Sequence, residues 1–334
     1  MTLEPTNRNT TSWNLAGTKT FRLSSRKLMG RWGTNLQNPS DRICQIYIPD
    51  KGKIFVQVDQ AGAEALVVSY LTTKGFLREL FINGIKSHCY LALKIFHADW
   101  DKDMKWTSGR AAALLALHPS ELVAHRDWKA LLGPIKEHKF RYFISKKTCH
   151  ASNYGMMENT FRDDVLKESG GTVALTNREA GIFLGSYHNI FPEIRWWHSE
   201  VVKTVDKTGM LHNLFGFPRE FYCLWVDNKI KRDAIAFVPQ STVGTITNMA
   251  VVKLQHEIET DKRRWDILNN KHDSYLVQVP LGEEGEAIAS MSRHMEADLV
   301  SPRGERFKMK TEASLGYNWG KKTKDNPEGL EDVK

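Results

Sequence analysis

The stretch KIFVQVDQAGAEALVVSYL, residues 53–71, decides the fold of this chain. In its first half Ile54, Val56 and Val58 alternate with Phe55, Gln57 and Asp59, which is the period of a strand with one buried face. From Ala63 onward apolar residues recur every three or four positions, the period of a helix. Asp59 ends the strand just before that helix, where an unpaired carboxylate is costly. Asp59 therefore either caps the helix or holds a cation.

A second acidic residue in a comparable position favours the cation. Residues 267–280, ILNNKHDSYLVQVP, have the pattern of a hairpin whose tight turn contains His272, Asp273 and Ser274. The chain thus carries two aspartates that follow or precede apolar strands, far apart in sequence.

Charge is concentrated in one part of the chain. Its 334 residues carry 47 Lys and Arg against 39 Asp and Glu, a net charge of +8, and suffice for one large domain or two. Twelve basic and six acidic residues lie between Lys86 and Lys147, so +6 of the +8 falls there. This excess suggests a polyanionic partner. The ordinary apolar and charged fractions argue against wholesale disorder.

The cysteines and the termini indicate a reducing compartment. The four cysteines are far apart and form no CxxC, which argues against a zinc site, and they are Cys44, Cys89, Cys149 and Cys223. No apolar run approaches the ~18–20 residues of a membrane span, so no membrane partner is expected. The N-terminus lacks the apolar core of a signal peptide. We expect a cytoplasmic protein, or one in the host cytoplasm if a virus encodes it.

Two polar or basic segments have the residue types that bind nucleic acid. FRLSS (21–25) and TNLQNPSDR (34–42) are either solvated loops or segments that grip phosphates. The run HKFRYFISKKTCHASNYG predicts a basic helix that ends near Gly155, with Lys146, His150 and Tyr154 on one face. That face is either a snorkelling lysine over half-buried rings or a surface for phosphate and base.

Further helix signals complete the outline. Ser120 is predicted to cap a helix that follows it, and Thr176 with Glu179 forms a predicted capping box. Residues 229–259 predict a helix in which Pro239 marks a kink or a junction.

Taken in order, these segments resemble the polymerase domain of family A DNA polymerases, the bacterial DNA polymerase I type, in a phage or split form. RLSS and NLQN are similar to the segment before the family's first catalytic strand, and Asp59 with Glu64 resembles motif A. Lys146 to Gly155 resembles motif B, and His272–Asp273 resembles motif C. NIFPEIRWW, LHNLFGFPR and EASLGYNW recur in the family at the corresponding places. The resemblance covers residues 18–320, approximately.

The resemblance implies an α+β fold: a right-hand polymerase with an antiparallel-sheet palm and a helical fingers subdomain. The implied segments are a flexible arm (1–20), a first palm part with motif A (21–85), fingers (86–225) with motif B near 139–155, a second palm part with motif C (226–320) and a charged tail (321–334).

The implied activity is template-directed DNA synthesis. A nucleotidyl group passes from a dNTP to the 3′-hydroxyl of a primer, and two Mg²⁺ ions about 3.5–4 Å apart neutralise the charge that develops. Asp59 and Asp273 are the implied ligands and catalytic residues, with the carbonyl of Gln60 as a further ligand.

The resemblance also implies nucleotide and DNA contacts. Lys146 would meet the triphosphate, with Lys147 as the fallback, while His150 stacks on the base, Tyr154 closes the templating position and Glu64 blocks a 2′-hydroxyl. His88 and Arg141 complete the implied nucleotide-binding set. The implied DNA-binding residues are Arg22, Asn35, Gln37, Asn38, Arg232, Gln240 and His272. Arg232 and Gln240 would donate to minor-groove acceptors that are alike for every correct pair.

Several departures from the family pattern bear on activity. Ser274 stands where a glutamate usually follows His–Asp, and His150 replaces a phenylalanine or tyrosine. Tyr142 stands where the family has an arginine, so Arg141 or Lys139 would have to serve instead.

Few residues precede RLSS, so the thumb and exonuclease are expected to be absent. A second polypeptide would then supply the thumb, with or without an exonuclease, and an incomplete gene would look the same. Two alternatives stay open: a DNA-binding accessory subunit with a dead centre, and a single-subunit RNA polymerase.

Overall fold

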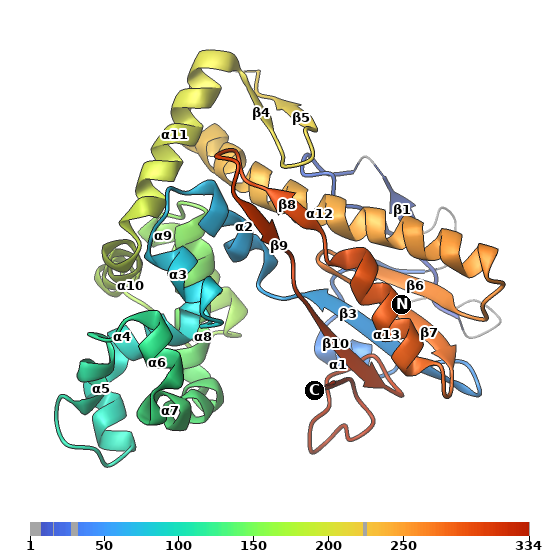
Figure 1. Cartoon of the computed structure of the whole chain (residues 1–334), viewed down its shortest axis with the longest axis horizontal. Helices are drawn as coiled ribbons and strands as arrows, with labels where there is room; N and C mark the ends of the chain where they lie inside the picture. The colour runs from blue at the N-terminus through green and yellow to red at the C-terminus, as the bar shows by residue number, and fades with distance from the viewer. Residues whose placement is uncertain (1–7, 16, 28–32, 223–225, 334) are drawn as a thin grey trace. The chain divides into compact units, whose positions relative to one another are not determined.

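A five-stranded antiparallel sheet with β3 at its centre carries the strand predicted from residues 53–60 (Figure 1). The strand order is β11-β10-β3-β7-β6. The strands are β3 (Lys53–Gln60), β6 (Asp266–Lys271), β7 (Ser274–Pro280), β10 (Thr311–Gly316) and β11 (Glu331–Asp332). The computed structural model describes the chain except for residues 1–7, 16, 28–32, 223–225 and 334. The predicted strand, the following helix and the 267–280 hairpin are all confirmed.

The alternation in β3 divides its side chains between two cores. Ile54, Val56 and Val58 pack with β7 and with helices α12 (Asn228–Thr260) and α13 (Glu284–Met295). Phe55 faces the other side, in a second cluster that includes Trp319. Both faces of β3 are therefore packed, where the sequence pattern predicted one buried face, and this burial fixes the register of the strand.

The chain divides into two compact units. The first, here called the sheet unit, comprises Met1–Glu64, His212–Arg219 and Phe237–Lys334, and the second, the helical unit, comprises Ala65–Leu211 and Glu220–Ala236. This division is coarser than the predicted domain boundaries, which stay predictions.

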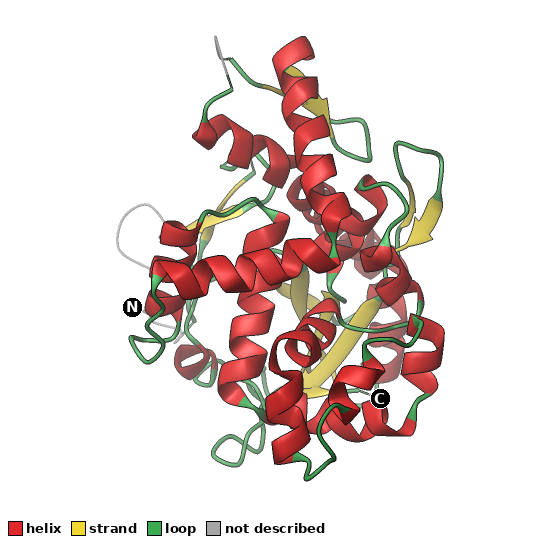
Figure 2. Cartoon of the chain, turned by 90° about the vertical axis from the view of Figure 1, so that its left-hand side faces the viewer, coloured by secondary structure: helices red, strands yellow, loops and turns green. Residues whose placement is uncertain are grey.

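Helices make up the helical unit almost entirely (Figure 2). They are α2 (Ala63–Leu71, which starts at the boundary), α3 (Phe76–Ile82), α4 (Ser87–Asp103), α5 (Arg110–Leu114), α6 (Pro119–Ala124), α7 (Arg126–Glu137), α8 (Lys139–Asn153), α9 (Glu158–Glu168), α10 (Asn177–Ile190), α11 (Pro192–Thr208) and the first part of α12, residues 228–236. One of its cores joins α8, α9 and α10 through Ile144, Phe161 and Leu184. The basic helix predicted to end near Gly155 is α8, and its prediction is confirmed.

Two cap predictions had different outcomes. The capping box of α10 is confirmed: the Thr176 hydroxyl accepts from the Glu179 amide at 3.2 Å, and the Glu179 carboxylate accepts from the Thr176 amide at 2.7 Å. The prediction that Ser120 caps a helix was wrong. His118 caps α6 instead, because Pro119 fits the first helical position, where a missing N–H costs nothing.

Helix α12 runs from residue 228 to 260 with Pro239 inside it, so the helix is continuous, and the boundary between the two units falls at Ala236 and Phe237, close to the predicted kink or junction. Among the described residues it is the one helix long and apolar enough to cross a membrane by length and composition. However, 67% of its apolar window is buried inside the protein. Packing of α12 as a core helix therefore accounts for its composition.

Both ends of the chain contain short strands. In the predicted flexible arm, β1 (Ser12–Asn14) pairs with β2 (Ser24–Arg26). In the predicted charged tail, β11 pairs with β10 at the edge of the main sheet. The remaining short elements are α1 (Asp41–Cys44), β4 (Met210–His212), β5 (Pro218–Glu220), β8 (Asp298–Val300) and β9 (Arg306–Lys308).

Candidate active site

The pairing of β3 with β7 brings the two predicted catalytic aspartates to neighbouring positions. Asp59 lies directly opposite Ser274, the residue after Asp273. The Gln60 amide, one residue beyond Asp59, donates to the Asp273 carbonyl at 3.0 Å. The ladder therefore joins two residues that are more than two hundred positions apart in sequence. Both aspartates are partly exposed.

Asp273 belongs to the turn between β6 and β7, so strand alternation does not dictate the direction of its side chain. His272, the other turn residue, has a φ of +60°, which is uncommon for a residue with a Cβ. Its imidazole Nε2 lies 3.1 Å from the Asn38 amide oxygen. Burial, then the positive charges of Arg22 and Lys271, lower the pKa of His272, and the Glu64 carboxylate opposes that shift. Two predicted DNA-binding residues, Asn38 and His272, are thus brought together at the turn.

The oxygen donors near Asp59 fit a magnesium site that is completed by substrate. Mg²⁺ in proteins usually takes one or two carboxylates and fills its other positions with water and phosphate oxygens. Ser274 is buried, and its hydroxyl donates to the Lys271 carbonyl at 3.2 Å. Glu312 lies opposite Asp59 on the other neighbouring strand, β10. The described residues contain no group of three or more His, Cys, Asp and Glu side chains that could hold a metal. Asp59 and Asp273 are the two carboxylates that the β3–β7 pairing places at neighbouring positions, and their role as metal ligands stays a prediction.

The Gln60 side chain is committed to α12. Its amide nitrogen donates to the Thr247 hydroxyl at 2.7 Å and to the Val243 carbonyl at 3.2 Å. Its side-chain oxygen is buried without a hydrogen-bond partner among the described residues. The predicted metal ligand at Gln60 is its main-chain carbonyl, which these side-chain contacts do not involve, and that role stays a prediction.

Gln37 has a structural environment that its sequence context did not indicate. It is buried, its side-chain oxygen accepts from the Ser25 amide at 3.0 Å, and its nitrogen donates to the Leu23 carbonyl at 2.8 Å. Asn35 is exposed, and its side-chain oxygen accepts from the Gln37 amide at 2.9 Å. Gln37 thus ties the 23–25 segment to the loop that follows it. Its predicted DNA contact would have to break this network.

In the helical unit, α8 presents the predicted stripe. Lys146 and His150 are exposed and Tyr154 is half-buried. The His150 and Tyr154 ring centroids are 5.0 Å apart with planes at 79°, an edge-to-face contact. A cation and two rings on one exposed face can meet a phosphate and a base.

Lys147, the predicted fallback, points to α9. Its ammonium group pairs with the Glu168 carboxylate and lies 3.5 Å from the Asp164 carboxylate. Lys146 forms no ion pair within the described part of the chain. The environment of the two lysines favours Lys146 as the group available to a triphosphate.

Arg141 is also engaged within the unit. Its guanidinium lies 4.3 Å from the centroid of the buried Trp100 ring and 2.6 Å from the Asp103 carboxylate. The Arg141 side chain is only 12% exposed. These contacts join α8 to α4 and engage the Arg141 guanidinium within the helical unit, and its implied nucleotide role stays a prediction.

Positive charge converges on His88 near the start of α4. Burial, then Lys146, Lys86 and Lys136, lower the pKa of His88 to about 4, so the imidazole is neutral at pH 7. Its ring meets Tyr142 edge-on at 5.1 Å. Three elements thus supply lysines to one neighbourhood, and only Lys146 was singled out from the sequence. The excess of basic residues between 86 and 147 was the signal for the other two.

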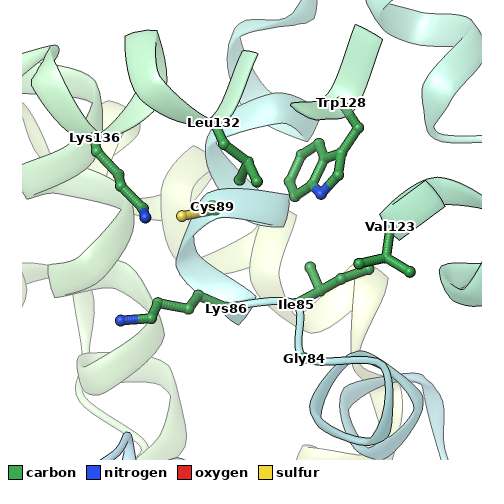
Figure 3. A pocket seen from close by; sticks show the side chains of 8 residues that line it. All are labelled: Gly84, Ile85, Lys86, Cys89, Val123, Trp128, Leu132 and Lys136. Carbon is green, nitrogen blue, oxygen red and sulfur yellow. The ribbon is translucent and has the colours of Figure 1, made fainter. Parts of the chain in front are cut away.

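Lys86 and Lys136 also border a small pocket of about 110 Å³, in which Cys89 and Trp128 form part of the lining (Figure 3). Burial raises the pKa of the Cys89 thiol to about 11, so the sulfur adds no negative charge. The pocket is therefore apolar inside and cationic at its border.

Arg232 and Gln240 share α12 but belong to different units. Arg232 is exposed and falls in the helical unit, whereas Gln240 is half-buried and falls in the sheet unit.

An antiparallel sheet with two strand-end aspartates, in a chain that also has a basic helical unit, defines the class of palm-and-fingers polymerases. The family model described as DNA polymerase family A matches residues 139–321. This chain belongs to DNA polymerase family A.

Relatives of this chain match it in sequence over nearly its whole length. It is 23% identical to DNA polymerase I of Borreliella burgdorferi, over 94% of this chain and 30% of that protein. It is also 23% identical to the thermostable DNA polymerase I of Thermus aquaticus, over 94% of this chain and 33% of that protein. The chain thus spans about a third of the length of these relatives.

A solved structure supports the fold. The POL domain of Pol1 from M. smegmatis, in complex with DNA primer-template and dNTP, matches with a TM-score of 0.68. The match covers 96% of this chain and 49% of that one, at 18% identity. The α+β palm-and-fingers fold implied by the sequence is confirmed.

Proposed function

We propose that this chain carries out template-directed DNA synthesis, by transfer of a nucleotidyl group from a dNTP to the 3′-hydroxyl of a primer. The observation that carries the proposal is the β3–β7 ladder, which joins Asp59 and the Asp273 turn in the sheet unit. Family membership supports the same reaction.

Asp59 and Asp273 would hold two magnesium ions, which supply charge neutralisation for the hydroxyl and the leaving pyrophosphate. The carboxylates supply negative charge at the end of the ladder, and the buried strand behind them keeps their positions fixed. Ser274 cannot supply a third carboxylate, so the proposal includes a slower reaction than a glutamate there would allow.

The helical unit would bind the nucleotide. Lys146 is exposed and would meet the triphosphate as a point charge, while His150 and Tyr154 offer ring faces and edges to a base. The charges of Lys86 and Lys136 near His88 would support Lys146 in place of the engaged Arg141.

Primer extension with Mg²⁺ tests the proposal. Wild type should extend a primer by dNTPs, and Asp59→Asn or Asp273→Asn should abolish extension while duplex binding persists. Asp298→Asn, which changes an exposed carboxylate in the same unit, is the matched control and should extend normally. Extension that survives both active-site substitutions would refute the two-metal assignment.

Two alternatives have their own outcomes in this assay. Ser274 favours an accessory subunit with a dead centre, which would bind duplex and never extend it. A single-subunit RNA polymerase would incorporate rNTPs as well as dNTPs, and its selectivity would not change in Glu64→Ala.

Binding of the primer-template is a further part of the proposal. A second polypeptide that supplies a thumb, with or without an exonuclease, would raise affinity for the primer-template because phosphate contacts dominate that affinity. Extension measured with and without candidate partners tests this.

The compartment is a further part of the proposal. Cys44, Cys89 and Cys149 are buried free thiols, which fits the reducing cytoplasm of a cell or of a host cell.

A further inference from the structure

Glu64, which would exclude the 2′-hydroxyl, is held by an enclosed ion pair. The Arg22 guanidinium binds the Glu64 carboxylate, and the two side chains are only 16% and 20% exposed. A pair so poorly hydrated is more firmly fixed than an exposed surface pair. The Arg22 Nε is buried without a hydrogen-bond partner among the described residues. Within the part of the chain that the structure describes, Glu64 is the acidic residue that pairs with the Arg22 guanidinium.

The residue before Arg22 is forced into an unfavourable backbone conformation. Phe21 has a φ of +56°, which side chains with a Cβ rarely adopt. Its ring lies 5.7 Å from that of Phe217 and 6.0 Å from that of Phe237, and its carbonyl accepts from the Asn248 side chain at 2.8 Å. Packing and this hydrogen bond therefore fix the turn that directs Arg22 toward Glu64.

Gly244 on α12 gives the Arg22 segment room to approach the helix. A Cβ at this position would lie 2.8 Å from Arg22 Cγ and 3.6 Å from Arg22 Cα, and 3.5 Å from the Thr20 carbonyl oxygen. The two backbone contacts are at ordinary van der Waals distance, so the clash is with Cγ of the Arg22 side chain, which would have to shift. Any larger residue at 244 should displace Arg22.

We propose that Arg22 is a positioning residue for sugar selection: it fixes the Glu64 carboxylate, and Gly244 and Phe21 fix Arg22. The inference rests on the proposed function. A glutamate excludes a 2′-hydroxyl only while its side chain stays in one place. Without the guanidinium the carboxylate can rotate away, or rotate to accept a hydrogen bond from the 2′-hydroxyl, and ribonucleotides then enter.

The test compares kcat and KM for dNTPs and for rNTPs on one primer-template. Arg22→Gln should lower the dNTP-to-rNTP ratio of kcat/KM by about 10- to 100-fold, chiefly by lowering KM for rNTPs. Arg22→Lys keeps the charge and should restore part of the ratio. Gly244→Ala should lower it in the same direction although residue 244 touches no substrate. Gly285→Ala in α13, where an added Cβ meets nothing within 4 Å, is the matched control and should leave the ratio unchanged.

A double-mutant cycle separates positioning from a direct DNA contact. In a Glu64→Ala background, Arg22→Gln should change the ratio no further. If Arg22→Gln slows dNTP and rNTP incorporation equally and leaves the ratio at its wild-type value, Arg22 serves only the primer-template and the inference is overturned. If wild type extends no primer, the proposed function fails, and this inference fails with it. Thermal unfolding of each variant shows whether it is folded, and Arg22→Lys replaces Arg22→Gln if the latter is not.

Discussion

Replacing Arg141 with alanine should cost stability and leave nucleotide affinity intact. The resemblance to family A implies a nucleotide role for a cation in this part of α8, and Arg141 is one step from the position concerned. In the structure the Arg141 guanidinium lies over the buried Trp100 ring and pairs with Asp103. Removing the guanidinium therefore breaks contacts between α8 and α4, and not a contact with the nucleotide.

The expected loss follows from these two contacts. A cation over the face of a buried tryptophan contributes ~1–2 kcal/mol, and an ion pair to a half-exposed aspartate ~0.5–1 kcal/mol. Their sum, about 1.5–3 kcal/mol, omits the packing of the aliphatic stem. For a unit of this size, each kcal/mol shifts Tm by about 2–4 °C. Arg141→Ala should then lower the Tm of the helical unit by roughly 3–12 °C.

Thermal unfolding and single-nucleotide kinetics should be measured on the same preparations. Arg178→Ala removes an exposed arginine of α10 that has no ion pair within the described residues, and its Tm should match wild type. The Arg141→Ala enzyme, assayed well below its Tm, should keep the wild-type KM for dNTP. An unchanged Tm combined with a raised KM would refute the structural assignment and restore Arg141 to the nucleotide site.

Three further outcomes are expected. Lys146→Ala should raise KM for dNTP by about 10- to 100-fold, because a charge-assisted contact to phosphate contributes ~1.5–3 kcal/mol. Lys147→Ala should mainly lower Tm. Equal effects of the two substitutions on KM would contradict this assignment. Ser274→Glu should raise kcat roughly tenfold, and a fall in kcat would show that a third carboxylate is not accommodated. Burial lowers the pKa of His198 from 6.5 to about 4. As pH falls, the unfolded protein therefore protonates this side chain before the folded protein does. The contribution of neutral His198 to the free energy of unfolding is complete above pH 6.5 and is lost as pH falls toward 4. In His198→Gln, the free energy of unfolding measured by denaturation should vary less with pH over that range.

Local patterns in the sequence were enough to place many elements. The period-2 pattern from Ile54 to Val58 identified the central strand, although both faces of β3 are packed and the pattern indicated one buried face. The Thr176–Glu179 box identified the start of α10, because it depends on four consecutive residues. The prediction for Ser120 was wrong because the helix begins two residues earlier, with His118 as its N-cap and Pro119 as its first residue.

The sequence by itself determined the two aspartate-bearing segments, the basic helix and the family to which their order corresponds, since each of these is written in a short run of residues. Tertiary structure alone decided which side chains are available. Lys147 and Arg141 look as suited to a phosphate as Lys146 does, until ion pairs to α9 and α4 engage them. Likewise, only the approach of the Arg22 segment to α12 shows what holds Glu64. Such contacts join residues that are distant in sequence, and their energies depend on burial that no local pattern records.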